Sequence, residues 1–158
     1  MTFVGDDDNV PMKRSDALAQ LSRDHHHGLV VAQRLNRATE TTAPAARETF
    51  LTFWETEGRD HFQVEEDVLL PAFAPHHAPT DDAVTRVLTD HADLRHRAAD
   101  LATNPSPEPE ELHALGERLH AHIRHEERIL FPRIEAALSE NELIELAAAV
   151  EIANRQRA

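Results

Sequence analysis

Two segments of the chain carry a histidine and a glutamate four residues apart. The first contains His61 and Glu65, and the second contains His122 and Glu126. Residues four apart on an α-helix lie on one face, about 6 Å apart along the helix axis. Each pair can therefore direct an imidazole and a carboxylate at one point. Two such helices facing each other would bring together four ligands of the kind that hold iron, manganese or zinc.

The two segments belong to a longer repeat. Both read H-x-x-x-E-E-x-x-L-[LF]-P, and two further histidines, each preceded by an aspartate, occur as Asp24-His25 and Asp90-His91. The order D-H, H-x-x-x-E, D-H, H-x-x-x-E along the chain is typical of a duplicated helical hairpin.

Apolar residues at three-to-four spacing predict four long helices and a shorter fifth. Ser15 is a candidate cap of the first helix, Ser139 and Glu142 form a capping box before the fifth, and a Pro-rich segment at 104–109 separates the third helix from the fourth. The predicted long helices are 15–39, 44–72, 81 or 82–103, and 110–138.

The candidate ligands lie on the apolar stripes of these helices. Long helices with short connections predict an up-down-up-down bundle whose stripes face one core. The expected stripes also include Val68, Leu88 and Ile129. Ionisable groups are costly to bury in such a core unless they are paired or bind a cation, which argues for a metal site. The residues that interrupt the stripes are His25, His61, Glu65, His91, His122 and Glu126.

The composition limits the setting of this site. The 158 residues suit one domain, and we expect residues 1–12 to form a flexible acidic arm and residues 13–158 the helical bundle domain. The net charge of −13 disfavours nucleic acid and anionic membranes as partners. The chain has no cysteine, which excludes disulfides and thiolate metal ligands and fits the cytoplasmic location that we expect.

These motifs resemble those of the hemerythrin-like, or HHE cation-binding, domains over roughly residues 15–155. The resemblance implies an all-α, hemerythrin-like four-helix bundle with an additional short C-terminal helix. It also implies a non-haem centre of two iron ions with a bridging oxo or hydroxo group, manganese or zinc being less expected. By the same resemblance, Glu65 and Glu126 bridge the two ions, and the four histidines are terminal ligands.

The number of ligands separates this chain from the oxygen carriers that it resembles. Those use five histidines and two carboxylates, whereas this chain offers four well-placed histidines and two glutamates. Each iron then has five ligands, which leaves an open position on both. The resemblance thus favours a protein that binds or reacts with peroxide, nitric oxide or oxygen as a scavenger or sensor. A catalase-like or nitric-oxide-reducing oxidoreductase, an iron store or donor, and a reversible oxygen binder are the alternatives, and the electron donor is unknown.

Three residues near the expected ligands have open roles. Glu57 lies one turn before His61 and is expected to be either a hydrogen-bond partner of a ligand or an alternate ligand. His26 is the alternative to His25, although we expect it to be exposed. His125 lies within the second H-x-x-x-E segment, about one turn from His122, and is a candidate hydrogen-bond partner of a ligand.

Four acidic residues adjacent to the expected ligands are also ambiguous. Asp24 and Asp90 could orient a ligand by a hydrogen bond, or lie on the helix surface. Glu66 and Glu127 follow the two motif glutamates and are expected to be solvated.

Overall fold

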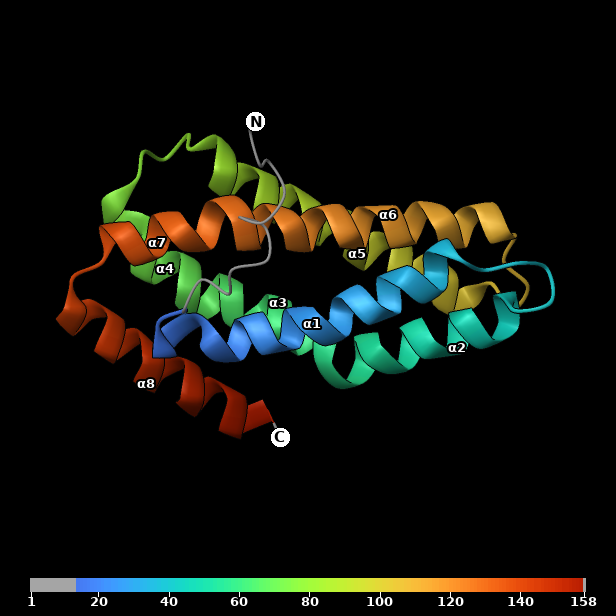
Figure 1. The fold of residues 1–158 in the computed structure, drawn as a ribbon, viewed down its shortest axis with the longest axis horizontal. Coiled ribbons are helices and arrows are strands. Elements are labelled where there is room, and N and C mark those ends of the chain that lie inside the picture. Colours follow the sequence, from blue (N-terminus) through green and yellow to red (C-terminus); the bar gives the residue numbers. More distant parts are fainter. Residues whose placement is uncertain (1–13, 158) are drawn as a thin grey trace, which may run out of the picture.

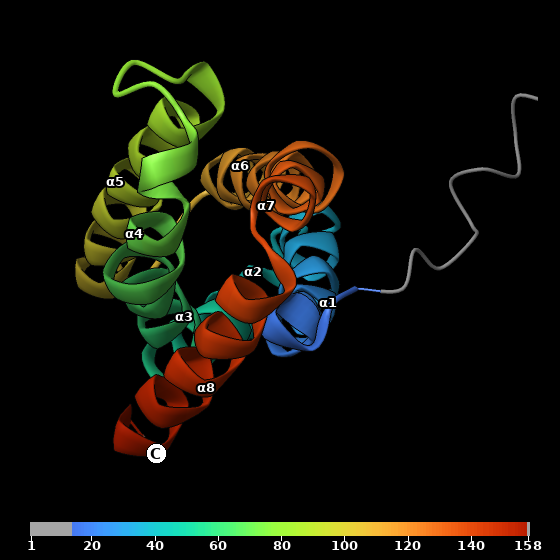
Figure 2. The same cartoon turned by 90° about the vertical axis from the view of Figure 1, so that its left-hand side faces the viewer.

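The computed structural model describes residues 14–157, and this part of the chain folds into helices alone. Four long helical segments run up, down, up and down, and a fifth helix lies obliquely across one end of the bundle (Figure 1). The end-on view in Figure 2 shows this fifth helix beside α1 and α3. These features confirm the predicted all-α fold. The predicted arm, residues 1–12, lies outside the described residues.

The helices begin and end close to the predicted positions. The first long segment is α1 (Asp16–Asn36). The second is a continuous run of α2 (Ala43–Phe53), η2 (Trp54–Gly58), α3 (Arg59–Val64), η3 (Glu65–Leu69), α4 (Leu70–Phe73) and η4 (Ala74–His76). The third is α5 (Asp82–Thr103), and the fourth consists of α6 (Pro109–His125), η5 (Glu126–Leu130) and α7 (Phe131–Ala137). The fifth helix is α8 (Glu140–Arg157). Between residues 14 and 157, no helix is both long and apolar enough to cross a membrane.

One of the two predicted helix caps is present, and α5 has a cap that was not predicted. Asp81 accepts hydrogen bonds from the first backbone N–H groups of α5, and Ser139 and Glu142 form the expected reciprocal capping box before α8. Ser15 occupies the cap position of α1, but its side chain makes no capping hydrogen bond. Its carbonyl accepts from Leu18 and Ala19 instead.

The apolar core lies on both sides of a polar layer. On each long segment, a run of buried apolar residues precedes the candidate ligands and another run follows them. On α1, for example, Leu18 and Leu21 belong to one cluster, Ala32 and Leu35 belong to the other, and His25 separates them. Helix α8 buries Leu146 and Val150 against the first of these clusters. The bundle therefore holds the histidines and glutamates in a layer between two apolar blocks.

Two π-helical turns interrupt the long segments, and each begins at a motif glutamate, Glu65 or Glu126. In η3, the N–H of Leu70 donates to the carbonyl of Glu65, and in η5, the N–H of Phe131 donates to the carbonyl of Glu126. These bonds span five residues instead of four, so each turn contains an extra residue. A third π turn, η2, precedes His61.

The π turns correct the predicted apolar stripes. Ile129 is 46% exposed, and the neighbouring Leu130 is fully buried in its place. Val68 is likewise only partly buried, while Leu69 is fully buried. The extra residue rotates the side chains that follow the glutamate about the helix axis, relative to their directions in a regular α-helix. A prediction based on 3.6 residues per turn therefore places the residue before the buried one in the core.

Leu88 on α5 was also expected on the buried stripe, and it is 46% exposed. Val87 is buried instead, four residues before His91. Residues three and four positions before His91 both lie near its helix face. In the packed bundle, the residue four positions away, Val87, is the one that is buried.

Candidate metal centre

All six expected ligands meet in the polar layer at the middle of the bundle. His25 lies on α1, His91 on α5 and His122 on α6, while His61 lies on α3. Glu65 and Glu126 are the first residues of the π turns η3 and η5. All six side chains are buried, and both glutamates are fully inaccessible to solvent.

The six residues form two overlapping groups. Within each group, one candidate ligand atom from every residue lies within 4.8 Å of the others. The first group is His25, His61, Glu65 and Glu126, and the second is Glu65, His91, His122 and Glu126. The two glutamates are thus common to both groups, and each group adds its own pair of histidines.

Each shared glutamate turns one oxygen toward each histidine pair. Glu126 Oε2 lies 3.0 Å from His25 Nε2, and its Oε1 lies 2.8 Å from His122 Nε2. This arrangement suits a carboxylate that bridges two cations.

Glu65 has the same orientation. Its Oε2 lies 3.3 Å from His61 Nε2, and its Oε1 lies 3.2 Å from His91 Nε2. The two halves of the centre are therefore related by an approximate two-fold arrangement, as expected for a duplicated hairpin.

Every one of the four histidines also has an outer carboxylate partner. The Nδ1 atom of each ring lies 2.6–3.2 Å from a carboxylate oxygen. The pairs are His25 with Glu127, His61 with Asp24, His91 with Glu66, and His122 with Asp90. A carboxylate only accepts hydrogen bonds, so each Nδ1 carries the proton. The lone pair of a neutral ring then lies on Nε2, which faces the centre.

The inner atoms of the centre are hydrogen-bond acceptors that face one another. His25 Nε2 and His61 Nε2 are 3.1 Å apart. Among the described residues, several buried inner atoms have no hydrogen-bond partner, namely both carboxylate oxygens of Glu65 and of Glu126 and the Nε2 atoms of His91 and His122. Buried acceptors that converge in this way are destabilising unless protons or cations lie between them. The donor set therefore fits a pair of cations.

In the absence of a cation, the histidines hold protons strongly. Burial disfavours the charged imidazole of His91, but its contacts with Glu126 and Glu65 outweigh this effect and raise its pKa to about 9. Burial likewise opposes protonation of His122, whereas the charge of Glu126 and the hydrogen bond to Asp90 raise its pKa to about 10. The pKa of Glu126 is lowered despite its burial, chiefly by the positive charge of His122. Cations and protons therefore compete for the same inner atoms.

The sequence did not reveal the role of Glu66 and Glu127, which were expected to be solvated. They accept the Nδ1 hydrogen bonds of His91 and His25 at 2.6 Å and 2.7 Å. Both glutamates are the second residues of π turns, in which consecutive side chains diverge less than in an α-helix. The repeated Glu-Glu in both motifs was the only sequence feature that pointed to this role.

Asp24 and Asp90 act across the bundle and not on the histidines beside them in sequence. Asp24 Oδ2 lies 3.1 Å from His61 Nδ1, and Asp90 Oδ2 lies 3.2 Å from His122 Nδ1. Successive residues on a helix point about 100° apart, so an aspartate next to a ligand faces the neighbouring helix.

The remaining ambiguous residues lie outside both groups. Glu57 belongs to neither group and pairs with His27 Nδ1 at 2.6 Å. His125 is buried, but its Nε2 lies 3.0 Å from the carbonyl of Ala83, so it contacts α5 and not a candidate ligand. His26 is exposed, as expected.

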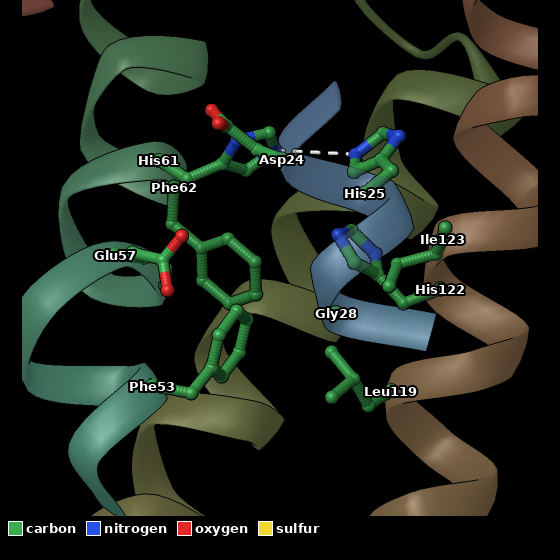
Figure 3. A pocket seen from close by; sticks show the side chains of 11 residues that line it. Asp24, His25, Gly28, Phe53, Glu57, His61, Phe62, Leu119, His122 and Ile123 are labelled. Atoms are coloured by element: carbon green, nitrogen blue, oxygen red, sulfur yellow. Dashed lines mark hydrogen bonds and ion pairs between the residues drawn. The ribbon is translucent and has the colours of Figure 1, made fainter. Parts of the chain in front are cut away.

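A small cavity adjoins the centre on the side of His25 and His61 (Figure 3). Its volume is about 20 Å³, enough for about one water molecule. Apolar side chains form much of its wall, including Phe53, Phe62, Leu119 and Ile123, and Gly28 contributes a stretch of bare backbone. A small molecule in this cavity would therefore be in contact with the histidines but largely shielded from water.

Comparisons with known proteins identify the domain. No curated protein and no solved structure matches the chain. A model of the hemerythrin HHE cation binding domain matches residues 16–134, a range that contains all six converging residues. Because this match covers well over half of the chain, the chain belongs to the family of hemerythrin HHE cation-binding domains.

Proposed function

We propose that the chain is a non-haem di-iron protein that binds or reacts with peroxide, nitric oxide or oxygen as a scavenger or sensor. The observation that carries this proposal is the overlap of two groups of buried ligands on two common carboxylates. A single cation would use one group and leave the inner Nε2 atoms of the other histidine pair without a cation. Two cations that share Glu65 and Glu126 use every inner atom.

The donor set favours iron. Imidazole and carboxylate ligands together suit iron, and sites with two histidines, carboxylates and open positions are typical of non-haem iron. Helical bundles commonly hold such di-iron centres between facing helices. When bound, the iron pair would supply the redox chemistry and the open positions at which a small ligand binds.

The side chains around the centre have separate tasks. The outer carboxylates fix the ring orientation of the histidines and make them stronger donors. The apolar blocks above and below the centre exclude water, which strengthens electrostatic interactions within it. The cavity beside His25 and His61 accommodates a molecule of very few atoms, which agrees with peroxide, nitric oxide or oxygen.

The proposal is tested with protein reconstituted with iron(II) under anaerobic conditions. We expect charge-transfer bands in the near ultraviolet after oxidation, a nitrosyl adduct on titration of the reduced protein with nitric oxide, and oxygen evolution from peroxide. His61→Ala should diminish these reactions. His76→Ala, which changes an exposed histidine paired with Glu142, should leave them intact. An iron-loaded protein that is inert to peroxide, nitric oxide and oxygen would contradict the proposal. One that only binds and releases oxygen repeatedly without autoxidation would contradict the scavenger or sensor role and support a reversible oxygen binder.

A further inference from the structure

An arginine outside the ligand set completes the network around His25. Arg14 donates to Glu127 Oε2 from Nη2 at 2.9 Å and from Nε at 3.3 Å, and it also donates to the backbone carbonyl of Glu127. The other carboxylate oxygen of Glu127 faces His25 Nδ1. Phe131 closes the group, because its ring stacks on His25 with centroids 5.2 Å apart, and Arg14 Cζ lies 5.7 Å from the same centroid. Arg14 Nη1 donates to Glu135 Oε1 at 2.7 Å, which fixes the remaining end of the guanidinium.

The other half of the centre has an equivalent group. Arg95 Nη1 donates to Glu66 Oε2 at 2.7 Å, and the same oxygen accepts from His91 Nδ1 at 2.6 Å. Phe62 stacks on His91 with centroids 3.9 Å apart and an angle of 8°, and Arg95 Cζ lies 5.9 Å from the Phe62 centroid. Each half therefore contains a closed ring of contacts among an arginine, a glutamate, a histidine and a phenylalanine.

The glutamate and the histidine of each ring occupy equivalent positions in the duplicated hairpin, but the arginines do not. Arg14 precedes α1 and lies before the residues that the family model matches, whereas Arg95 lies within α5, four residues after His91. The two arginines thus come from unrelated positions in the repeat. They nevertheless reach the same place relative to the centre, one behind each histidine pair. A shared physical requirement explains this better than a shared ancestry of the segments.

We propose that Arg14 and Arg95 are positioning residues, each of which holds an outer glutamate against one imidazole and thereby tunes one of the two metals. This inference rests on the proposed di-iron function. A carboxylate that accepts the Nδ1 hydrogen bond makes the imidazole a stronger donor to the metal. A guanidinium on the far side of the carboxylate withdraws negative charge from it and limits this effect. The arginines thus stabilise the reduced, less positively charged form of each metal.

The first test uses the zinc-loaded protein, so that it does not depend on redox chemistry. Arg14→Met keeps the unbranched apolar stem of the side chain and removes its charge and its hydrogen bonds. We expect this variant to shift the Nδ1–H proton resonance of His25 and leave that of His91 in place, whereas Arg95→Met does the reverse. Arg47→Met is the matched control, because Arg47 is 15% exposed, against 12% for Arg14, and binds backbone carbonyls at the other end of the bundle. It should shift neither resonance.

The second test measures the iron-loaded protein. Arg14→Met and Arg95→Met should each lower the midpoint potential, by about 59 mV for a tenfold change in the relative affinity for the two oxidation states. Each should change the Mössbauer parameters of one iron more than those of the other. Arg14→Lys, which keeps the charge, should restore most of the potential.

Two results would overturn the inference. One is that both arginine variants lose thermal stability as Arg47→Met does, while the Nδ1–H resonances and the potentials stay unchanged, since the arginines would then be only structural. The other is that each variant shifts both resonances equally. If the resonances and potentials shift as expected but the protein is inert to peroxide, nitric oxide and oxygen, the positioning role stands and the proposed function fails.

Discussion

Replacing Gly28 with alanine tests whether the cavity beside the histidines admits the small ligand. An added Cβ would lie 2.7 Å from Ile123 Cδ1 and 3.6 Å from Phe53 Cζ. Non-bonded carbon atoms pack best at about 3.5–4.0 Å, so the end of the Ile123 side chain has to move by about 1 Å. The new methyl group would occupy much of a cavity of about 20 Å³.

The substitution should change stability little. Alanine stabilises the interior of a helix by about 1 kcal/mol relative to glycine. An Ile123 side chain forced away from its preferred rotamer costs about 0.5–1.5 kcal/mol. These effects nearly cancel, so the free energy of unfolding should change by less than about 1 kcal/mol, which corresponds to about 2–4 °C in Tm for a chain of this size.

Ligand binding should change much more. A ligand that enters the filled cavity has to push apart the new methyl group and the side chains around it. Overpacking of this kind costs about 1–3 kcal/mol. The affinity should therefore fall roughly tenfold to a hundredfold. The assay is titration of the iron(II) protein with nitric oxide and of the iron(III) protein with azide, whose greater length should increase the loss.

Gly116→Ala is the control for a general effect of glycine replacement. Its Cβ would lie 2.9 Å from the backbone oxygen of Ala32, away from the cavity, so this variant should lose stability while its folded fraction binds both ligands normally. The reasoning is refuted if folded, fully metallated Gly28→Ala binds nitric oxide with the affinity of the unsubstituted protein.

Glu65→Ala and Glu126→Ala should each lose more iron than His61→Ala, because each glutamate faces both histidine pairs; elemental analysis compares them, and equal losses would argue against bridging. Iron should stabilise the folded protein by about 2.7 kcal/mol when its free concentration is 100 times Kd, so identical melting temperatures with and without iron would place the site elsewhere. In metal-free protein, the raised pKa values of His91 (about 9) and His122 (about 10) mean that the folded state binds more protons than the unfolded state. This stabilisation is complete below about pH 6.5 and disappears as the pH rises through 9 and 10. Urea unfolding at pH 7 and pH 10 measures it, and greater stability at pH 10 would contradict these shifts.

The fold and the convergence of the six candidate ligands could be predicted from the sequence because both depend on local spacing. A histidine and a glutamate four residues apart lie on the same helix face. When that face is also the apolar stripe of a helix in a bundle, both side chains must point into the shared core. The repeated D-H and H-x-x-x-E order also indicated which helices face each other. The predicted convergence of the ligands is correct despite the π turns η3 and η5, because the motif residues precede the extra residue in each turn.

Asp24 and Asp90 could be named from the sequence as possible partners of a ligand, but not which histidine each contacts. The outer glutamates and the arginines could not be predicted at all, because they depend on helix register and on contacts between distant segments. A π turn after Glu126 buries Leu130 instead of Ile129 and lets Glu127 reach His25, 102 residues away in the chain. Nothing in the local spacing of the motif requires this turn. Arg14 is separated from Glu127 by 113 residues, so only the packed bundle reveals that they meet.

Mössbauer spectroscopy of the iron-reconstituted protein, combined with its iron content, tests the central claim most directly. Two overlapping ligand groups with two common carboxylates predict two iron ions per chain whose spins are coupled, so that the oxidised protein has a diamagnetic ground state at low temperature. One iron per chain, or a spectrum of magnetically isolated ferric ions, would contradict the shared roles of Glu65 and Glu126.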